Sequence, residues 1–461
     1  MIQNPMRLYY NQQFPPIDTH LLEFDFPEPA VKKLSSGLTV LFILHHQLPK
    51  IYIRLGLDLG NKHDPASKAG LAELLSYTIK KGTVNRTYQD IISSVEQVGG
   101  ELDTAGNEDF LVIHGEFLRE YLDTGLDIIQ DMVLNPNFPP EEVEKERQKQ
   151  IADLENEKSS PQFLASRRLE KALYDPHPYG IHKTLSSLQN ITREDLLEKT
   201  AERSYPAGAF LVLAGDISIE NSLKKIEDNF KPWNTPIPET DYPREPRKTT
   251  VPQIHIVHRP DSEQTNIVMG NLLFARKHPD YEKMLVMNKI LGGGGSGRLF
   301  LNLREEKGYT YGAYSTLQTN REQGIFLAHG EVRNEVVTES IQAFQQEFRR
   351  MQDEKVPEDE LRNAVRYLLG IFPLQNETPS SIAALALKQR LYDLGDMYWK
   401  RYAELIKSVS AEDVREMAGT HIRQDRMVTV VVGDAKKLAE KLENLGEIHV
   451  FDQEDNPLDE W

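Results

Sequence analysis

Segments with alternating apolar and polar residues and segments with a helical period follow one another along the whole chain. Alternation over residues 38–44 and 51–55 predicts half-buried strands. A period of three to four residues predicts helices over 69–81, 88–98, 118–132, 140–158 and 192–202. Each half of the chain is thus predicted to run strand, strand, helix, strand, strand, several helices and a final strand. Strands segregated from helices predict an α+β fold, with a mainly antiparallel sheet in each half and helices packed on one face of that sheet.

Three sequence matches recur at one spacing of 218 residues. They pair residues 173–175 with 391–393, residues 191–195 with 409–413, and residues 212–216 with 430–434. A constant offset indicates a duplicated unit, whereas two unrelated domains that share common sequence words have no reason to keep it. We therefore predict two duplicated halves, an N-terminal domain at 21–235 and a C-terminal domain at 253–461.

Prolines gather between the two predicted domains, at positions 232, 236, 238, 243, 246 and 252. A proline-rich stretch with few periodic apolar residues is typical of a linker, which we place at 236–252. Residues 1–20 have no apolar stretch of signal-peptide length and are interpreted as an N-terminal arm. No apolar run approaches the roughly 20 residues of a membrane-spanning helix. The sequence as written therefore predicts no membrane span and favours a cytoplasmic location.

Composition removes several classes of function. The chain has 461 residues, enough for two to four domains of roughly 100–200 residues each. It has no cysteine, which excludes disulfides, thiolate metal sites and a cysteine nucleophile. The net charge of −17 argues against a nucleic-acid partner, because such binding depends on Lys and Arg that neutralise phosphates.

The predicted helix at 69–81 carries Glu73, Ser76 and Tyr77 on one polar face, at i, i+3 and i+4. Taken alone, they are most simply the solvent-facing side of an amphipathic helix. The surrounding frame, Gly70-Leu-Ala followed by Lys80-x-Gly-Thr, resembles the pitrilysin and mitochondrial-processing-peptidase family of zinc peptidases, whose helix reads His-x-x-Glu-His. The segment His177-Pro-Tyr-Gly matches another landmark of that family, and the resemblance extends from about Val31 to Asp452.

The resemblance assigns family roles to four positions. Glu73 stands at the first His ligand, Ser76 at the general-base Glu, Tyr77 at the second His ligand, and Asp153 at a third ligand on a later helix. Zinc prefers imidazole or carboxylate ligands in a tetrahedral array, and a serine cannot serve as the general base. These positions are therefore interpreted as a degenerate motif, with no metal or other cofactor in this chain and no independent peptidase activity expected.

A glycine-rich segment, Gly292-Gly293-Gly294-Gly295, follows the predicted helix at 281–291. It fits a dinucleotide-binding pattern formally, but that fingerprint requires a preceding strand. A loop that ends a helix is the simpler interpretation. The segment also resembles the glycine-rich loop of the non-catalytic α subunit of mitochondrial processing peptidase, which implies that these glycines bind substrate.

Arg304 and Tyr311, seven residues apart, resemble the Arg/Tyr pair of the family. The resemblance implies that Arg304 holds a substrate carbonyl or carboxylate and that Tyr311 donates to the developing oxyanion, both in trans on the zinc site of a partner. The simpler alternative is a surface arginine and a core tyrosine.

The resemblance therefore implies the metal-free subunit of a heterodimeric zinc metallopeptidase. Its partners would be a paralogous subunit with an intact His-x-x-Glu-His motif, which holds the zinc, and an unfolded peptide substrate bound along a sheet edge. Two alternatives remain open: a catalytically inactive peptide-binding or scaffold homodimer, and an independent hydrolase that uses Glu73 and Asp153. A neighbouring gene that encodes such a paralogue would favour the first interpretation.

Overall fold

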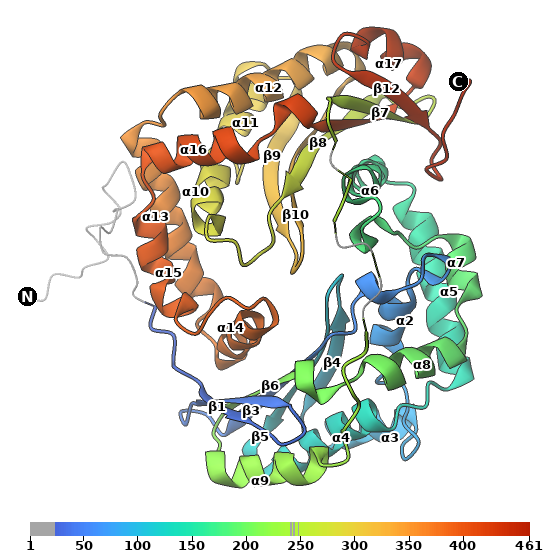
Figure 1. Cartoon of the computed structure of the whole chain (residues 1–461), viewed down its shortest axis with the longest axis vertical. Coiled ribbons are helices and arrows are strands. Elements are labelled where there is room, and N and C mark those ends of the chain that lie inside the picture. The colour runs from blue at the N-terminus through green and yellow to red at the C-terminus, as the bar shows by residue number, and fades with distance from the viewer. Residues whose placement is uncertain (1–23, 240–241, 243–244, 248) are drawn as a thin grey trace, which may run out of the picture.

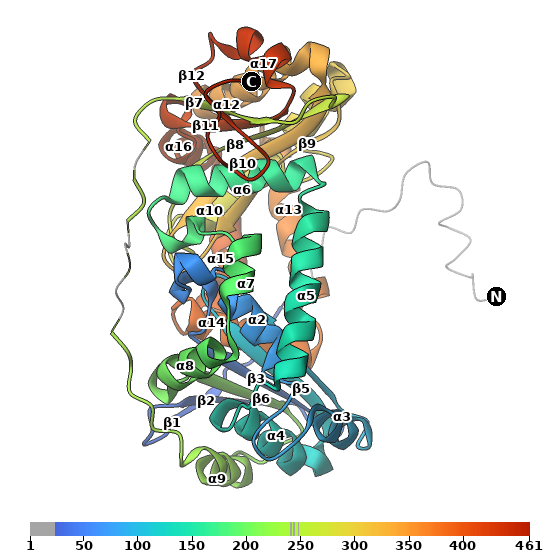
Figure 2. The same cartoon turned by 90° about the vertical axis from the view of Figure 1, so that its right-hand side faces the viewer.

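The computed structural model describes residues 24–239, 242, 245–247 and 249–461, which form two halves facing each other (Figure 1). The predicted N-terminal arm at 1–20 lies outside the described residues, as does part of the predicted linker. Figure 2, turned by 90°, shows that the described residues between α9 and β7 lie along one side of the molecule. None of the described helices combines the length and apolar character that a bilayer crossing requires.

The first half is built on a six-stranded sheet with the strand order β1-β2-β6-β3-β5-β4. Its strands are β1 (Ala30–Lys33), β2 (Thr39–Leu44), β3 (Lys50–Leu57), β4 (Glu101–Gly106), β5 (Leu111–Leu118) and β6 (Phe210–Gly215). Its helices are α2 (Leu71–Thr78), α3 (Tyr88–Glu96), α4 (Leu122–Leu134), α5 (Pro140–Glu157), α6 (Pro161–Tyr174), α7 (Leu185–Asn190), α8 (Arg193–Arg203) and α9 (Ile219–Phe230).

The second half has a sheet of the same size with the order β12-β7-β11-β8-β10-β9. Its strands are β7 (Gln253–His258), β8 (Gln264–Leu273), β9 (Thr310–Thr319), β10 (Gly324–Arg333), β11 (Val428–Gly433) and β12 (Glu447–Phe451). Its helices are α10 (Tyr281–Leu291), α11 (Arg298–Phe300), α12 (Val337–Asp353), α13 (Glu358–Gln375), α14 (Pro379–Leu391), α15 (Tyr398–Lys407), α16 (Ala411–His421) and α17 (Ala435–Leu442).

The predicted α+β duplication is confirmed. Helices α5, α6 and α8 and strand β6 recur as α13, α14, α16 and β11, each shifted by 218 residues, and β6 and β11 take the same place in their sheets. The sheets are mainly antiparallel, with β6 parallel to β2 and β11 parallel to β7. The predicted succession of elements has five strands in each half, whereas each sheet has six, so one edge strand per half was not predicted. The first half takes β1 from its N-terminal side, antiparallel to β2, and the second takes β12 from its C-terminal side, parallel to β7.

Two sequence predictions about the helices are wrong in detail. The helix predicted from residue 118 begins at Leu122, because Leu118 still belongs to β5 and a 3-10 turn over Arg119–Tyr121 intervenes. The helix predicted at 69–81 is confined to α2, Leu71–Thr78.

The prediction that helices cover one face of each sheet is also incomplete. The other face of each sheet receives a helix from the opposite half: α6 packs on β8 and β11, and α14 packs on β3 and β6. A glycine marks each contact. A Cβ at Gly56 in β3 would lie 3.0 Å from Leu387 of α14, and one at Gly270 in β8 would lie 2.9 Å from Leu169 of α6. Glycine within a strand thus allows the close approach of a helix, once in each half.

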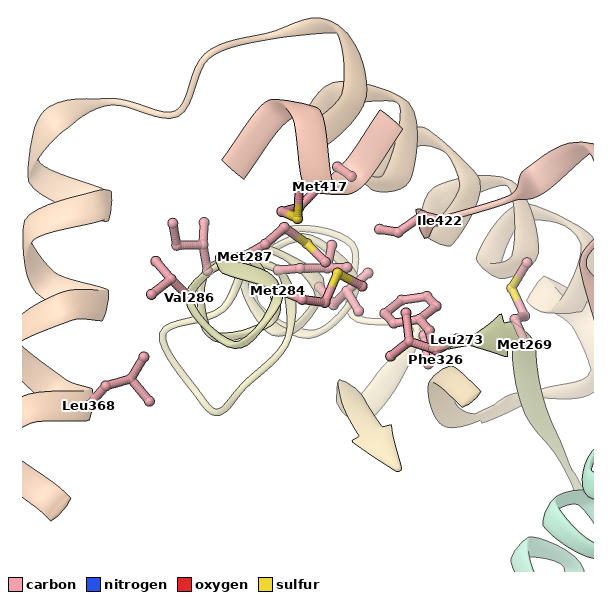
Figure 3. Close-up of a cluster of buried hydrophobic side chains, with 14 of the residues drawn as sticks. Met269, Leu273, Met284, Val286, Met287, Phe326, Leu368, Met417 and Ile422 are labelled. Carbon is pink, nitrogen blue, oxygen red and sulfur yellow. The ribbon is translucent and has the colours of Figure 1, made fainter. Parts of the chain in front are cut away.

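Each half has its own apolar core on the opposite side of its sheet. In the second half, methionines and aliphatic side chains of α10 and α16 meet β8 and β10 (Figure 3). Met284, Met287 and Met417 lie in this cluster together with Phe326, all of them almost fully buried. The two exchanged helices, by contrast, join the halves to each other, and this arrangement positions the candidate site.

Candidate functional site

Helix α2, which carries the degenerate motif, is anchored at its start. The carboxylate of Asp64 accepts hydrogen bonds from the backbone N–H groups of Gly70 (3.2 Å) and Ala72 (3.0 Å). These bonds satisfy donors that the first turn of a helix leaves unpaired. The ammonium of Lys199 lies 2.6 Å from the same carboxylate, so the start of α2 is fixed to α8.

Ser76, at the general-base position, is buried and engaged with its own helix. Its hydroxyl donates to the backbone oxygen of Glu73 at 2.7 Å, and its backbone oxygen accepts a hydrogen bond from the hydroxyl of Thr104 in β4 at 2.5 Å. These bonds tie α2 to the edge strand β4. A hydroxyl in this position has no basicity to offer near neutral pH.

Glu73, at the first ligand position, is paired with a lysine. The ammonium of Lys183 lies 2.9 Å from the carboxylate of Glu73 and 3.9 Å from that of Glu157 in α5. Lys183 therefore bridges α2 and α5, the two helices that carry the degenerate ligand positions. No pattern in the sequence pointed to Lys183, because it stands in a loop far along the chain from α2.

Asp153 lies on the exposed side of α5, in one stripe with Lys149 and Glu157 at i−4 and i+4. The ammonium of Lys149 lies 5.5 Å from the ring centroid of Tyr77, and Glu157 approaches Lys183. Two members of this stripe, Lys149 and Glu157, thus reach Tyr77 on α2 and the ion pair of Glu73. Asp153 itself has no ion pair within the described residues.

This set of side chains does not fit zinc. In the part of the chain that the structure describes, no three His, Asp or Glu side chains are grouped so that they could hold a metal ion. Glu73 is neutralised by Lys183, Ser76 is bonded to its own helix, and Tyr77 packs against Lys149. The geometry gives no support to an independent hydrolase that uses Glu73 and Asp153.

A polar cavity of about 270 Å³ lies beside Glu73 and Lys183, between α2 and α6. Its wall includes Arg167, Glu170 and His182. Burial raises the pKa of Glu170 to about 7 and lowers the pKa of His182 to about 3. Beside the ion pair, the cavity wall thus has a carboxyl group with a raised pKa, an imidazole with a lowered pKa and the guanidinium of Arg167.

The glycine-rich segment forms a packed turn at the end of α10. A Cβ at Gly292 would lie 2.5 Å from the backbone nitrogen of Ser315, and one at Gly293 would lie 2.8 Å from the Cα of Lys289. Gly294 has φ of +138°, a conformation that favours glycine. Packing and backbone conformation thus account for three of the four glycines, whereas a Cβ at Gly295 would make an ordinary contact with the ring of Phe300, at 3.8 Å.

Arg304 lies in a π-helical turn, Leu301–Glu306, that follows α11. Its side chain is 46% exposed, with the guanidinium carbon 4.7 Å from the ring centroid of Phe300 and Nε 3.6 Å from the carboxylate of Glu305. Such π-helical turns are rare and are found frequently at functional sites. The aromatic ring beneath the guanidinium leaves its outer N–H groups available.

Tyr311 lies at a β-bulge in the edge strand β9. Thr310 pairs with Val332 and Ala313 with Gly330, so Tyr311 and Gly312 stand opposite a single residue of β10. The hydroxyl of Thr310 holds the bulge through two hydrogen bonds with the backbone of Gly312. The side chain of Tyr311 is 86% exposed, which excludes the alternative of a core tyrosine. Bulges redirect side chains and are over-represented next to active sites.

The landmark His177-Pro-Tyr-Gly belongs to a buried ionic network between the halves. Lys62, 3% exposed, lies 3.1 Å from Asp109 and 3.2 Å from Glu322, which stands in the β9–β10 loop of the second half. His177 lies 3.5 Å from Glu322, and the hydroxyl of Tyr179 donates to Asp109 at 2.6 Å. Burial alone would raise the pKa of Glu322, but the neighbouring His177, a hydrogen bond from the hydroxyl of Tyr242 at 2.6 Å and the charge of Lys62 lower it to about 2. This landmark therefore joins the two halves.

Comparison with known proteins is consistent with the duplicated fold. The family described as "Insulinase (Peptidase family M16)" matches residues 39–184, and the family "Peptidase M16 inactive domain" matches residues 190–368. Among curated relatives, "Non-peptidase homolog YmxG" of Helicobacter pylori is 24% identical over 87% of this chain and 93% of its own length. "Uncharacterized zinc protease YmxG" of Bacillus subtilis is 22% identical over 84% of this chain and 93% of its own length.

Solved structures have the same fold. A peptidase M16 inactive domain from Pseudomonas fluorescens superposes with a TM-score of 0.81 at 24% identity, covering 88% of this chain and 98% of that one. A protease from Helicobacter pylori also gives a TM-score of 0.81, at 19% identity, over 88% of this chain and 99% of its own.

Proposed function

Because the chain belongs to peptidase family M16, the family that the sequence resembles, we propose that it is the metal-free subunit of a two-subunit zinc peptidase. In this proposal the chain binds an unfolded peptide and contributes Arg304 and Tyr311 to the zinc site of a paralogous partner. The observation that carries the proposal is an asymmetry between the halves. Glu73, at the first metal position on α2, is held in an ion pair with Lys183, whereas Arg304 and Tyr311 are exposed on irregular backbone.

The open edge of β4 supports peptide binding. Alternation of the β4–β5 ladder leaves the backbone groups of Leu102, Thr104 and Gly106 facing away from β5. At present the N–H of Thr104 donates to the carboxylate of Asp103 at 2.8 Å. An extended peptide can pair with such an edge through its main chain, which gives binding that tolerates many sequences.

The role of the Arg/Tyr pair follows from its chemistry. The hydroxyl of Tyr311 is a neutral donor that can bind the oxyanion formed when a peptide carbonyl is attacked. The guanidinium of Arg304 can hold a substrate carbonyl or carboxylate through two N–H groups. A zinc ion held by the partner would supply the activated water, and this chain would orient the substrate and stabilise the developing charge.

A second candidate is a catalytically inactive peptide-binding or scaffold homodimer. The name of the Helicobacter pylori relative, "Non-peptidase homolog", favours it. The two candidates differ in the partner: the first requires a zinc-bearing paralogue, and the second requires only another copy of this chain.

We expect the purified chain to form a 1:1 complex with a paralogue that has an intact His-x-x-Glu-His motif and to bind an unstructured fluorescein-labelled peptide. Size-exclusion chromatography with light scattering measures the assembly, and fluorescence anisotropy measures peptide binding. A chain that assembles only with itself, even with the paralogue in excess, but still binds peptide would favour the scaffold candidate. A chain that binds no peptide would contradict both.

A further inference from the structure

A cavity with a volume of about 600 Å³ lies beside the start of β4. One wall is apolar and comes from α3, with Ile91, Ile92 and Val95. Another wall is the inner face of the first sheet, and Ser380 at the start of α14 contributes from the second half. The cavity thus lies where the open edge of the first sheet meets the second half of the chain.

A guanidinium without a carboxylate partner lines this cavity. The Nη2 of Arg54 donates to the hydroxyl of Ser380 at 3.0 Å, and its Nε is buried without a hydrogen-bond partner among the described residues. No ion pair of Arg54 within 4.0 Å is found in the same part of the chain. Burial lowers the pKa of Arg54, and burial followed by the charge of Arg54 lowers the pKa of its cross-strand neighbour His114. A partly buried cation without a counter-charge favours the binding of an anion.

The carboxylates around the cavity do not fill this role. Glu116 is paired with Lys50, and Asp103 is paired with Lys80. Glu96 and Glu101 also line the cavity, but both are exposed to solvent, which weakens their interaction with a buried charge. The positive charge of Arg54 is therefore not paired with any carboxylate of the described residues, and an anionic ligand can bind to it.

We propose that this cavity binds a carboxylate group of the bound peptide, with Arg54 as its charged partner and the wall of α3 in contact with the apolar part of the peptide. The inference rests on the proposed peptide binding and adds a substrate class to it. The carboxylate belongs either to an acidic side chain or to the C-terminus of the peptide. Both present the two oxygens that a guanidinium binds in parallel.

The test uses three labelled unstructured peptides of one length on the full chain. One has a single Glu and an amidated C-terminus, one has Gln in its place and an amidated C-terminus, and one has Gln and a free C-terminus. We expect a carboxylate to strengthen binding by about 10–100-fold over the uncharged peptide, the effect of a hydrogen bond to a charged group. Anisotropy titrations measure the three affinities. Tighter binding of the Glu peptide would identify an acidic side chain as the source of the carboxylate, and tighter binding of the peptide with a free C-terminus would identify the C-terminus.

The variant Arg54→Gln should bind the three peptides with equal affinity, so the preference for a carboxylate is lost. Arg119→Gln is the matched control, because Arg119 is 63% exposed and already paired with Asp216. If Arg54→Gln does not fold, the peptide comparison on the unaltered chain still decides. Equal binding of all three peptides would overturn the inference while leaving the proposed function intact.

A separate arm distinguishes the two failures. If the unaltered chain binds none of the peptides, the proposed function fails, and titration with glutarate then examines the cavity by itself. Binding of glutarate that depends on Arg54 would support the carboxylate site without a peptide. No binding of glutarate would overturn the site as well.

Discussion

The variant Tyr311→Phe should lower the kcat of the reconstituted subunit pair by about 10²–10³-fold, the usual loss when one oxyanion donor is removed. Tyr311 is 86% exposed at the bulge of β9, so its ring makes little contribution to the core and assembly should be unchanged. Turnover of an unstructured fluorogenic peptide by the chain together with its zinc-bearing paralogue measures the effect. Arg304→Ala should raise KM as well, because the guanidinium holds substrate oxygens.

Tyr367→Phe provides the matched control. Tyr367 is also exposed, on α13, where Lys289 lies over its ring, and it has no place in the proposed mechanism. Its loss of a hydroxyl should leave kcat and KM unchanged. If Tyr311→Phe and Arg304→Ala assemble normally and turn over substrate like the unaltered pair, neither residue acts in trans and both are ordinary surface residues.

The variant Lys62→Met should destabilise the chain by about 3–5 kcal/mol, because it removes the cation from a buried group of carboxylates. Lys62 lies 3.4 Å from Asp58, 3.1 Å from Asp109 and 3.2 Å from Glu322. The unfolding temperature should fall by roughly 6–20 °C, since about 1 kcal/mol shifts it by 2–4 °C at this domain size. Because Glu322 belongs to the second half, the single thermal transition should also separate into two.

Lys225→Met is the control, since Lys225 forms an exposed pair with Asp123 and should change stability by less than about 1 kcal/mol. The lowered pKa of Glu322 adds a dependence on pH. Its contribution is present above the ordinary carboxyl pKa and is lost as the pH falls from about 4.3 towards 2. Equal unfolding temperatures for Lys62→Met and Lys225→Met would show that the network does not hold the halves together.

The duplication could be predicted because short segments of the sequence can be compared directly, and three pairs of them recur at the same offset of 218 residues. The exchange of α6 and α14 between the halves could not, since it depends on contacts between residues more than 100 positions apart. A signal for it does exist in the sequence: Gly56 and Gly270 stand among the apolar residues that form β3 and β8, and each faces a helix of the opposite half. A glycine inside an apolar strand indicates that another segment of the chain packs closely against the strand at that position.

The candidate site was predicted unevenly for a similar reason. The resemblance assigned Asp153 to a third ligand position on a later helix, and in the structure Asp153 shares a stripe of α5 with Lys149, which reaches Tyr77 on α2. Lys183 and Arg54 were missed, because an ion pair, or the lack of one, is decided only when distant segments fold together. The sequence allowed Tyr311 to be either an exposed tyrosine or a core tyrosine. The structure shows that it is exposed, at a bulge in β9, and a bulge breaks the alternation from which buried strand residues are predicted.

The central claim is that this chain contributes substrate contacts to a zinc site that it does not itself contain. The most direct measurement is the zinc content of the chain and of its complex with the paralogue, by plasma mass spectrometry, together with peptide turnover. We expect no stoichiometric zinc and no turnover for the chain alone, and one zinc with turnover for the 1:1 complex. One tightly held zinc in the chain alone, with turnover that a chelator abolishes, would contradict the account. Glu73 would then bind a metal ion instead of pairing with Lys183.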